Sequence, residues 1–205
     1  MSLRATKARV ISLLTGNDPL PEVLGALAAL PRSQVLKALF AALCHHDQHL
    51  RWRAVSAMGP VVAALADQDL EAARVVMRRF MWSLNDESGG IGWGAPEAMA
   101  ECLVHHEQLA EEYSHILVSF MREDGFYLEY PPLQQGLMWG LGRLAEVRPQ
   151  LLRSKNALLY LPPYLDSPDP VVRRRAAHAL ELLKAAASPV SPAFTGNAKI
   201  VDKKS

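Results

Sequence analysis

Carboxylate side chains recur in two segments that are rich in glycine or proline, with aromatic side chains inside or beside each segment. Residues 85–92 read NDESGGIG, and residues 123–132 read EDGFYLEYPP. Carboxylates attract cations by charge and aromatic ring faces attract them by their quadrupole, so this combination suits a basic peptide or a cationic ligand. Ten candidate binding residues lie in these segments or near them: Trp82, Asp86, Glu87, Trp93, Glu97, Asp124, Tyr127, Glu129, Tyr130 and Trp139.

A structural explanation of the same residues competes with the binding hypothesis. Asn85, Asp86 and Ser88 are of the types that cap helix ends, glycine permits tight turns, and tryptophan fills cores. A connection as long as 123–132, however, exceeds what capping requires, and long connections in compact proteins tend to carry function. The sequence alone leaves both explanations open.

Histidine and cysteine gather in two short segments, 44–49 and 102–106, and side chains of these types bind zinc. Cys102 and His106 are four residues apart, a spacing that places them on one face of a helix. The repeat described below puts the first cluster in a turn within a hairpin and the second at the end of a hairpin, so we expect them at opposite edges. We therefore predict no metal site and no cofactor.

The composition is that of a soluble globular protein with one domain. The chain has 205 residues, of which 50% are apolar and 21% charged. Its apolar stretches are too short to cross a membrane, and the apolar run after Arg9 is too short for a signal peptide. Two cysteines do not make a disulfide scaffold. We expect a cytoplasmic protein that does not act at a membrane; the oligomeric state stays open.

Charge is distributed unevenly along the chain, although the formal net charge is only +1. Residues 85–132 contain ten acidic side chains and a single basic one, Arg122, whereas residues 1–84 and 133–205 have net charges of +4 and +6. A long polyanion would meet this acidic centre, which argues against nucleic acid and for a basic or mixed-charge protein partner. A glutamate-rich, solvated helix face is the alternative explanation.

A repeat of about forty residues runs through the chain. WRAVSAMG at 52–59 aligns with WGAPEAMA at 93–100, an offset of 41, and further steps of 42 and 39 lead to 135–142 and 174–181. Each copy places a small residue before a large apolar one, which lets a neighbouring helix approach closely and fills the groove beside it. These four pairs are Ala57-Met58, Ala98-Met99, Gly140-Leu141 and Ala179-Leu180.

Another helix is predicted before each of the four repeated segments, because apolar residues recur there with helical spacing. This helix is the first of a hairpin, and the repeated segment forms the second. Proline and glycine separate the elements, for instance at Gly59-Pro60 and Pro131-Pro132, and Asp18 is placed to start a helix near the N-terminus. The four helices before the repeated segments are 33–44, 69–84, 108–122 and 150–161, and two shorter helices are predicted at 3–14 and 20–30.

The segment 165–183, LDSPDPVVRRRAAHALELL, resembles the second helix of a HEAT repeat of the PBS-lyase-like type, and 47–65 is similar. This resemblance implies an all-α fold, a right-handed α-α superhelix of about four to five helical hairpins with a concave face lined by the second helices. It places a single domain at 1–186 and an extended or disordered tail at 187–205. The hairpins are expected at 3–30, 33–65, 69–104, 108–146 and 150–186.

Arginines cluster at 173–175, and Arg51 and Arg53 occupy a similar place in an earlier repeat. They could form a ladder that binds phosphate groups. In the HEAT pattern such arginines pair instead with an aspartate of a neighbouring repeat, here Asp166 or Asp169. The resemblance favours the structural role.

The leading functional hypothesis is a non-enzymatic scaffold or adaptor that binds another protein through its concave face or its acidic, aromatic turns. One alternative is a HEAT-like nucleic-acid-binding protein or DNA glycosylase, with Trp52, Trp93 and Trp139 near Asp86 or Glu97. A further alternative is a chaperone similar to the phycobilin lyases. We assign no catalytic residue, because no nucleophile–base pair, phosphate loop or metal-ligand signature stands out.

Overall fold

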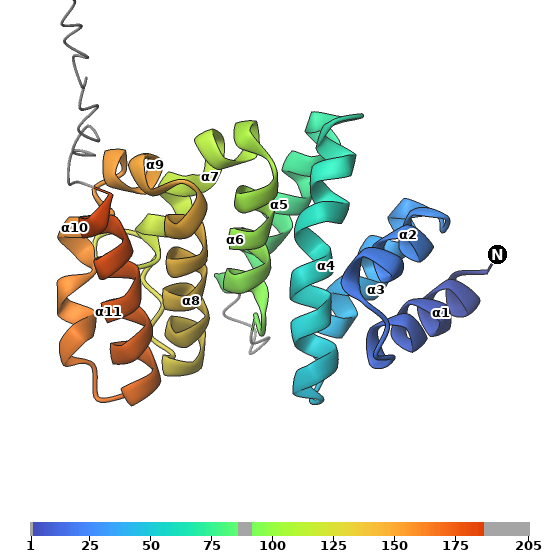
Figure 1. Cartoon of the computed structure of the whole chain (residues 1–205), viewed down its shortest axis with the longest axis horizontal. Coiled ribbons are helices and arrows are strands. Elements are labelled where there is room, and N and C mark those ends of the chain that lie inside the picture. Colours follow the sequence, from blue (N-terminus) through green and yellow to red (C-terminus); the bar gives the residue numbers. More distant parts are fainter. Residues whose placement is uncertain (1, 86–91, 187–205) are drawn as a thin grey trace, which may run out of the picture.

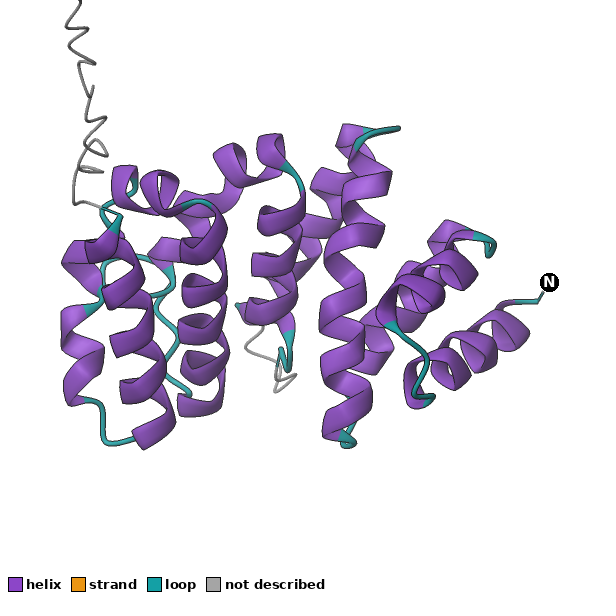
Figure 2. Ribbon diagram, viewed as in Figure 1, coloured by secondary structure: helices purple, strands orange, loops and turns teal. Residues whose placement is uncertain are grey.

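The computed structural model describes residues 2–85 and 92–186, and within these ranges every regular element is a helix (Figures 1 and 2). In chain order the helices are α1 (Leu3–Thr15), α2 (Leu20–Ala28), α3 (Arg32–Leu43), α4 (Gln48–Ala66), α5 (Leu70–Leu84), α6 (Ala95–His105), α7 (Glu107–Ser119), α8 (Pro131–Val147), α9 (Pro149–Ser154), α10 (Ala157–Tyr160), the 3-10 helix η1 (Pro162–Asp166) and α11 (Pro170–Ala185). The expected all-α solenoid of stacked helical hairpins is confirmed.

The second helix of each hairpin packs on the second helix of the next one. In Figure 1, α4, α6, α8 and α11 stand side by side, with α5 and α7 behind them, and each neighbouring pair in this row is in extensive contact. Helices α3, α5 and α7 pack chiefly on members of the row. We call the surface over α4, α6, α8 and α11 the second-helix face, because side chains from four hairpins meet on it.

The predicted register of small and large residues is confirmed in all four repeats. Ala57, Met58, Ala98 and Met99 have no exposed surface, and the pair formed by Ala179 and Leu180 is buried as well. Gly140 lies where α8 approaches α6 so closely that a Cβ atom there would be 2.8 Å from Cβ of Ala100. The small residue of the pair therefore sets the distance between successive second helices.

Aspartates start three of the longer helices. Asp47 accepts hydrogen bonds from the amides of His49 and Leu50, and Asp69 accepts one from Ala72. Asp169 does the same for Val171 and Val172. Each aspartate thereby satisfies amides that the first turn of a helix leaves without a partner.

Asp18 does not start α2, contrary to the prediction from its position. Pro19 occupies the N-cap and provides no side-chain hydrogen bond there. The backbone carbonyl of Asp18 instead accepts a hydrogen bond of 2.7 Å from Nη2 of Arg53. The segment before α2 is thus tied to α4 rather than to its own helix.

The predicted break at Gly59-Pro60 is wrong, because α4 continues through both residues to Ala66. A proline inside a helix removes one hydrogen bond and costs roughly 3 kcal/mol. Helix α4 tolerates it because α3, α5 and α6 all pack against this helix, and neighbours such as Met58 and Val62 are completely buried. Tertiary packing here outweighs the local preference.

The helix predicted at 150–161 is broken into two short pieces, α9 and α10. Asn156 separates them with a left-handed backbone, φ 62°. Asparagine adopts this conformation more readily than most residues, and a helix cannot continue through it. After this interruption, α10 and η1 lie beside the segment that joins α7 to α8, and side chains from all three line one hollow.

The close approach at Gly140 yields a stability prediction. Gly140→Ala adds a Cβ against Ala100, whereas Gly25→Ala, in α2, adds one where no atom lies within 4 Å. Both changes raise helix propensity, but only the first overpacks the row, at a cost of about 1–3 kcal/mol.

Urea unfolding should therefore show Gly140→Ala to be less stable than Gly25→Ala by roughly that amount. Equal stability of the two variants would contradict the proposed role of Gly140.

Candidate functional site

The third turn of the solenoid, residues 123–132, and the fourth turn, residues 162–170, border an open hollow of about 750 Å³ together with α10. It lies between the segment that joins α7 to α8 and the segment that leads through η1 to α11. Carboxylates and tyrosines dominate its lining, and we call it the acidic hollow. These carboxylates and tyrosines are Glu123, Asp124, Glu129, Asp166, Tyr127, Tyr160 and Tyr164.

One buried leucine orients the third turn. Leu128 is buried, and its amide donates a hydrogen bond of 3.1 Å to the carbonyl of Phe120. Gln134 at the start of α8 donates a hydrogen bond of 2.8 Å to the carbonyl of Leu128 and one of 3.3 Å to the hydroxyl of Tyr127. With Leu128 held inward, the residues on either side of it, Tyr127 and Glu129, face the hollow.

The fourth turn is fixed to the third by Tyr164. This side chain is buried, and its hydroxyl donates a hydrogen bond of 3.2 Å to the carbonyl of Met121. Burial raises the pKa of Tyr164, and the neighbouring Tyr127 contributes to the rise, so the phenol stays neutral near pH 7. The two walls of the hollow are thus connected through an uncharged contact.

Arg122 neutralises one carboxylate of the acidic hollow. Its Nε and Nη2 atoms donate to the two oxygens of Asp124 at 2.9 and 2.7 Å, and this pairing lowers the pKa of Asp124. The same guanidinium lies 5.2 Å from the ring centre of Tyr160. The other three carboxylates, Glu123, Glu129 and Asp166, form no ion pair with any described residue.

Trp93 and Tyr130 join this region to the preceding hairpin. Their ring centres are 5.8 Å apart, with an angle of 73° between the ring planes. Tyr130 is the residue before α8, and Trp93 lies shortly before α6. The structure thereby brings together two of the predicted aromatic residues from different turns. Asp86 and Glu87, predicted to join them, lie outside the described residues.

Trp82 belongs to a different surface. It is 81% exposed and lines a separate shallow hollow on α5 with Val75, Arg78 and Arg79. Its surroundings there are basic and apolar. It therefore does not belong to the acidic hollow.

Glu97 and Trp139 lie in α6 and α8 of the second-helix row. The Oε2 atom of Glu97 is buried and accepts no hydrogen bond from the described residues, and a Cβ on Gly136 would lie 2.5 Å from it. Burial raises the pKa of Glu97, while the charges of Arg175 and Arg51 oppose this rise. A buried carboxylate oxygen without a partner is unfavourable for folding and is typical of functional sites.

Trp139 pairs with Trp52 of α4 across the row. Their ring centres are 4.9 Å apart, in an edge-to-face arrangement with an angle of 62°. Trp52 was named in the nucleic-acid alternative but not among the ten candidate binding residues, although it aligns with Trp93 in the repeat. That alignment was the signal that could have identified it.

The arginines of the repeat segments mainly bond to backbone carbonyls, not to the aspartates expected from the HEAT pattern. Arg173 donates hydrogen bonds to the carbonyls of Ser167 and Pro168, and Arg175 donates one of 2.9 Å to the carbonyl of Gln135. Asp169 is already engaged by its own helix and by Gln135. The predicted pairing with Asp166 or Asp169 is therefore wrong for Arg173 and Arg175, which bond to backbone carbonyls instead.

The acidic centre of the chain does not face one surface. Glu107, Glu111 and Glu112 belong to α7, behind the row, and three further acidic residues lie in the third turn. Glu101 is buried in α6, where it accepts a hydrogen bond of 3.0 Å from Nε of Arg143. The charge argument against nucleic acid therefore does not extend to the second-helix face, and the expectation about nucleic acid stays a prediction.

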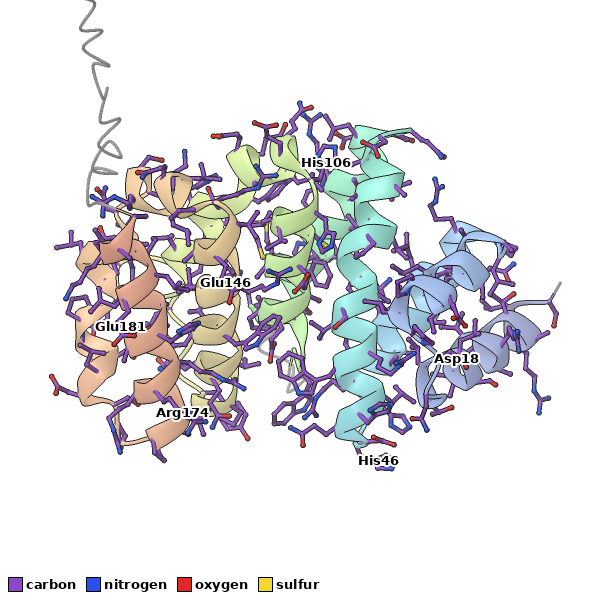
Figure 3. The ribbon with its side chains drawn as sticks, viewed as in Figure 1. Asp18, His46, His106, Glu146, Arg174 and Glu181 are labelled. Atoms are coloured by element: carbon purple, nitrogen blue, oxygen red, sulfur yellow. The ribbon has the colours of Figure 1, made fainter. Side chains whose placement is uncertain are left out.

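The two clusters of histidine and cysteine lie at opposite edges of the solenoid, as expected. Figure 3 shows His46 at the lower edge of the row and His106 at its upper edge. His106 caps α7 by accepting from the amide of Leu109, and Cys102 is buried, which raises the pKa of its thiol. Within residues 2–85 and 92–186, no three side chains of metal-ligating type come together. No helix in these ranges is long and apolar enough to span a bilayer.

Comparison with known proteins adds a partial relative. No family model matches the chain. An uncharacterized protein of Archaeoglobus fulgidus is 31% identical over 109 residues, which are 53% of this chain and 53% of that protein. The match therefore spans about half of each protein.

Two solved helical-repeat structures cover most of the chain. The match with one engineered protein spans 90% of this chain and 87% of the engineered protein, with 19% identity and a TM-score of 0.49. The match with a designed armadillo repeat protein, solved in complex with the peptide (KR)4, spans 85% of this chain and 80% of the designed protein. The identity is 19% and the TM-score is 0.47. The helices of this chain, rather than these similarities, establish the fold, and we draw no functional conclusion from either structure.

Glu97 yields a pH-dependent prediction. Its pKa is raised in the folded protein, so the folded state binds the proton more tightly than the unfolded chain does. As the pH rises above the ordinary carboxyl value of 4.5, the wild-type protein loses stability at this residue. Glutamine does not ionise, so Glu97→Gln should gain stability relative to the wild type as the pH rises above 4.5.

Chemical unfolding at several pH values measures this difference directly. Glu107→Gln, which changes an exposed residue of α7, serves as the control and should show no comparable trend. A Glu97→Gln difference that is constant or falls with pH would contradict the assignment.

Proposed function

We propose that this protein is a non-enzymatic scaffold that binds a basic segment of a partner protein in the acidic hollow. The observation that carries the proposal is the combination of four carboxylates and three tyrosines around one hollow of about 750 Å³. A single arginine, Arg122, offsets the negative charge. A lysine or arginine side chain suits this surface, because it is long enough to enter and carries the opposite charge.

The distribution of polar contacts supports a cationic occupant. Asp124 is already paired, while Glu129 and Asp166 are exposed on opposite walls and keep their charges free for a ligand. Exposed tyrosine rings, such as that of Tyr127, add attraction for a guanidinium or ammonium group. Two walls that are fixed to each other also reduce the entropy that binding would cost.

The repeat architecture is consistent with such a role. We propose that the hairpins are of the HEAT type, in which each hairpin buries its apolar face against its neighbours and leaves the turns available for contacts. A reducing compartment such as the cytoplasm suits the free cysteines, since Cys44 is exposed.

A basic peptide tests the proposal. Fluorescence anisotropy with a labelled octapeptide of alternating lysine and arginine should show saturable binding that weakens as salt is added. The double variant Glu129→Gln/Asp166→Asn removes two free carboxylates from the hollow and should weaken binding at least about tenfold, since hydrogen bonds to charged groups contribute about 1.5–3 kcal/mol each.

The matched control is Glu107→Gln/Glu111→Gln, which removes the same charge from exposed positions of α7. It should leave the affinity within about twofold of the wild type. Equal weakening by both double variants would mean that net charge alone attracts the peptide and would contradict a specific site.

A further inference from the structure

A second hollow, of about 340 Å³, opens on the second-helix face between α8 and α11. Figure 3 shows Glu146 and Arg174 on this face of the two helices. Three arginines line the hollow, together with one glutamate, one histidine and one tryptophan. These residues are Arg143, Arg174, Arg175, Glu146, His178 and Trp139. Its charge is thus opposite in sign to that of the acidic hollow.

Two of the three guanidiniums already have structural partners. Arg143 donates to Glu101 and to Glu146, at 3.0 Å each, and is thereby neutralised. Arg175 donates one hydrogen bond to the carbonyl of Gln135 and is half-buried. A guanidinium has five N–H donors, so most of those of Arg175 are not used by this bond.

Arg174 has no such partner. Its side chain is exposed and forms no hydrogen bond or ion pair with the described part of the chain, although Arg173 and Arg175 on either side both do. Glu146, the acidic residue of the lining, is shared by Arg143 at 3.0 Å and His178 at 3.8 Å. The hollow therefore has an excess of positive charge, concentrated at Arg174 and Arg175.

We propose that this hollow binds a small organic phosphate, with the phosphate at Arg174 and Arg175 and the organic part against the indole of Trp139. Arginine matches phosphate because its planar fork donates two parallel hydrogen bonds. The tryptophan supplies an apolar wall for a ring or chain attached to that phosphate. This binding is separate from the scaffold function proposed above and does not depend on it.

The charges along the row favour a small ligand over a nucleic-acid strand. Between Arg51 and Arg53 of α4 and the arginines of α8 and α11 lies α6, which contributes no lysine or arginine to the row. A polyanion that crossed the whole face would meet this interruption. The positive charge at α8 and α11 is confined to a hollow that suits one or two phosphate groups.

Isothermal titration calorimetry with ADP and with pyrophosphate tests this proposal on the full chain. Wild-type protein should bind ADP more tightly than pyrophosphate, because only ADP has a ring to contact Trp139. Arg174→Gln should weaken ADP binding about tenfold or more, as expected for the loss of charge-assisted hydrogen bonds.

Arg173→Gln is the matched control, since it removes the same charge one residue away and does not line the hollow. It should leave ADP binding nearly unchanged, and circular dichroism verifies that both variants fold. Absence of ADP binding at millimolar concentration, equal effects of the two variants, or equal affinity for ADP and pyrophosphate would each overturn the proposal. So would tighter, Arg174-dependent binding of a single-stranded oligonucleotide, which would indicate a nucleic-acid surface.

Discussion

The close approach of successive second helices is the constraint on which the rest of the structure depends. Gly140 on α8 allows contact with Ala100 on α6, and Gly136, one turn earlier, leaves room for the carboxyl of Glu97. Because the helices of the row touch through small residues, their registers are coupled. The same register that buries the apolar pairs places Trp52 against Trp139 and stacks the turns of neighbouring hairpins at one edge.

This arrangement separates the charges of the chain into surfaces of opposite sign. The carboxylates of the third and fourth turns meet at the edge because the turns of adjacent hairpins are neighbours. The arginines of α8 and α11 meet on the second-helix face because these two helices are in contact along their length. A net charge of +1 thus conceals an acidic and a basic hollow that lie on different parts of one solenoid. The cationic and the anionic ligand proposed above would therefore not compete for the same residues.

Much of the fold could be predicted from the sequence, because its signals are local and repeated. The small–large pairs and the helical spacing of the apolar residues are patterns of a few residues whose physical meaning does not depend on the rest of the chain. The continuation of α4 through Pro60 could not be predicted from local residue preferences, because packing by α3, α5 and α6 decides it.

The site was predictable to a smaller extent, because it requires contacts between turns that are far apart in sequence. Asp124, Tyr127 and Glu129 were identified from their composition, and the structure joins them to Tyr160, Tyr164 and Asp166. Neither the hydrogen bond from Tyr164 to Met121 nor the pairing of Arg122 with Asp124 leaves a recognisable sequence pattern. The broken helix at Asn156, which was not expected, is what places Tyr160 in the wall of the hollow.

The central claim is that the acidic hollow, rather than the acidic surface as a whole, recognises a basic segment. Two-dimensional NMR of the labelled protein, titrated with a lysine- and arginine-rich peptide, tests it most directly. We expect the largest amide shifts in residues 121–134 and 159–168, around the hollow, and little change in α7 and on the second-helix face. Shifts spread evenly over α7, or concentrated on α8 and α11, would contradict it.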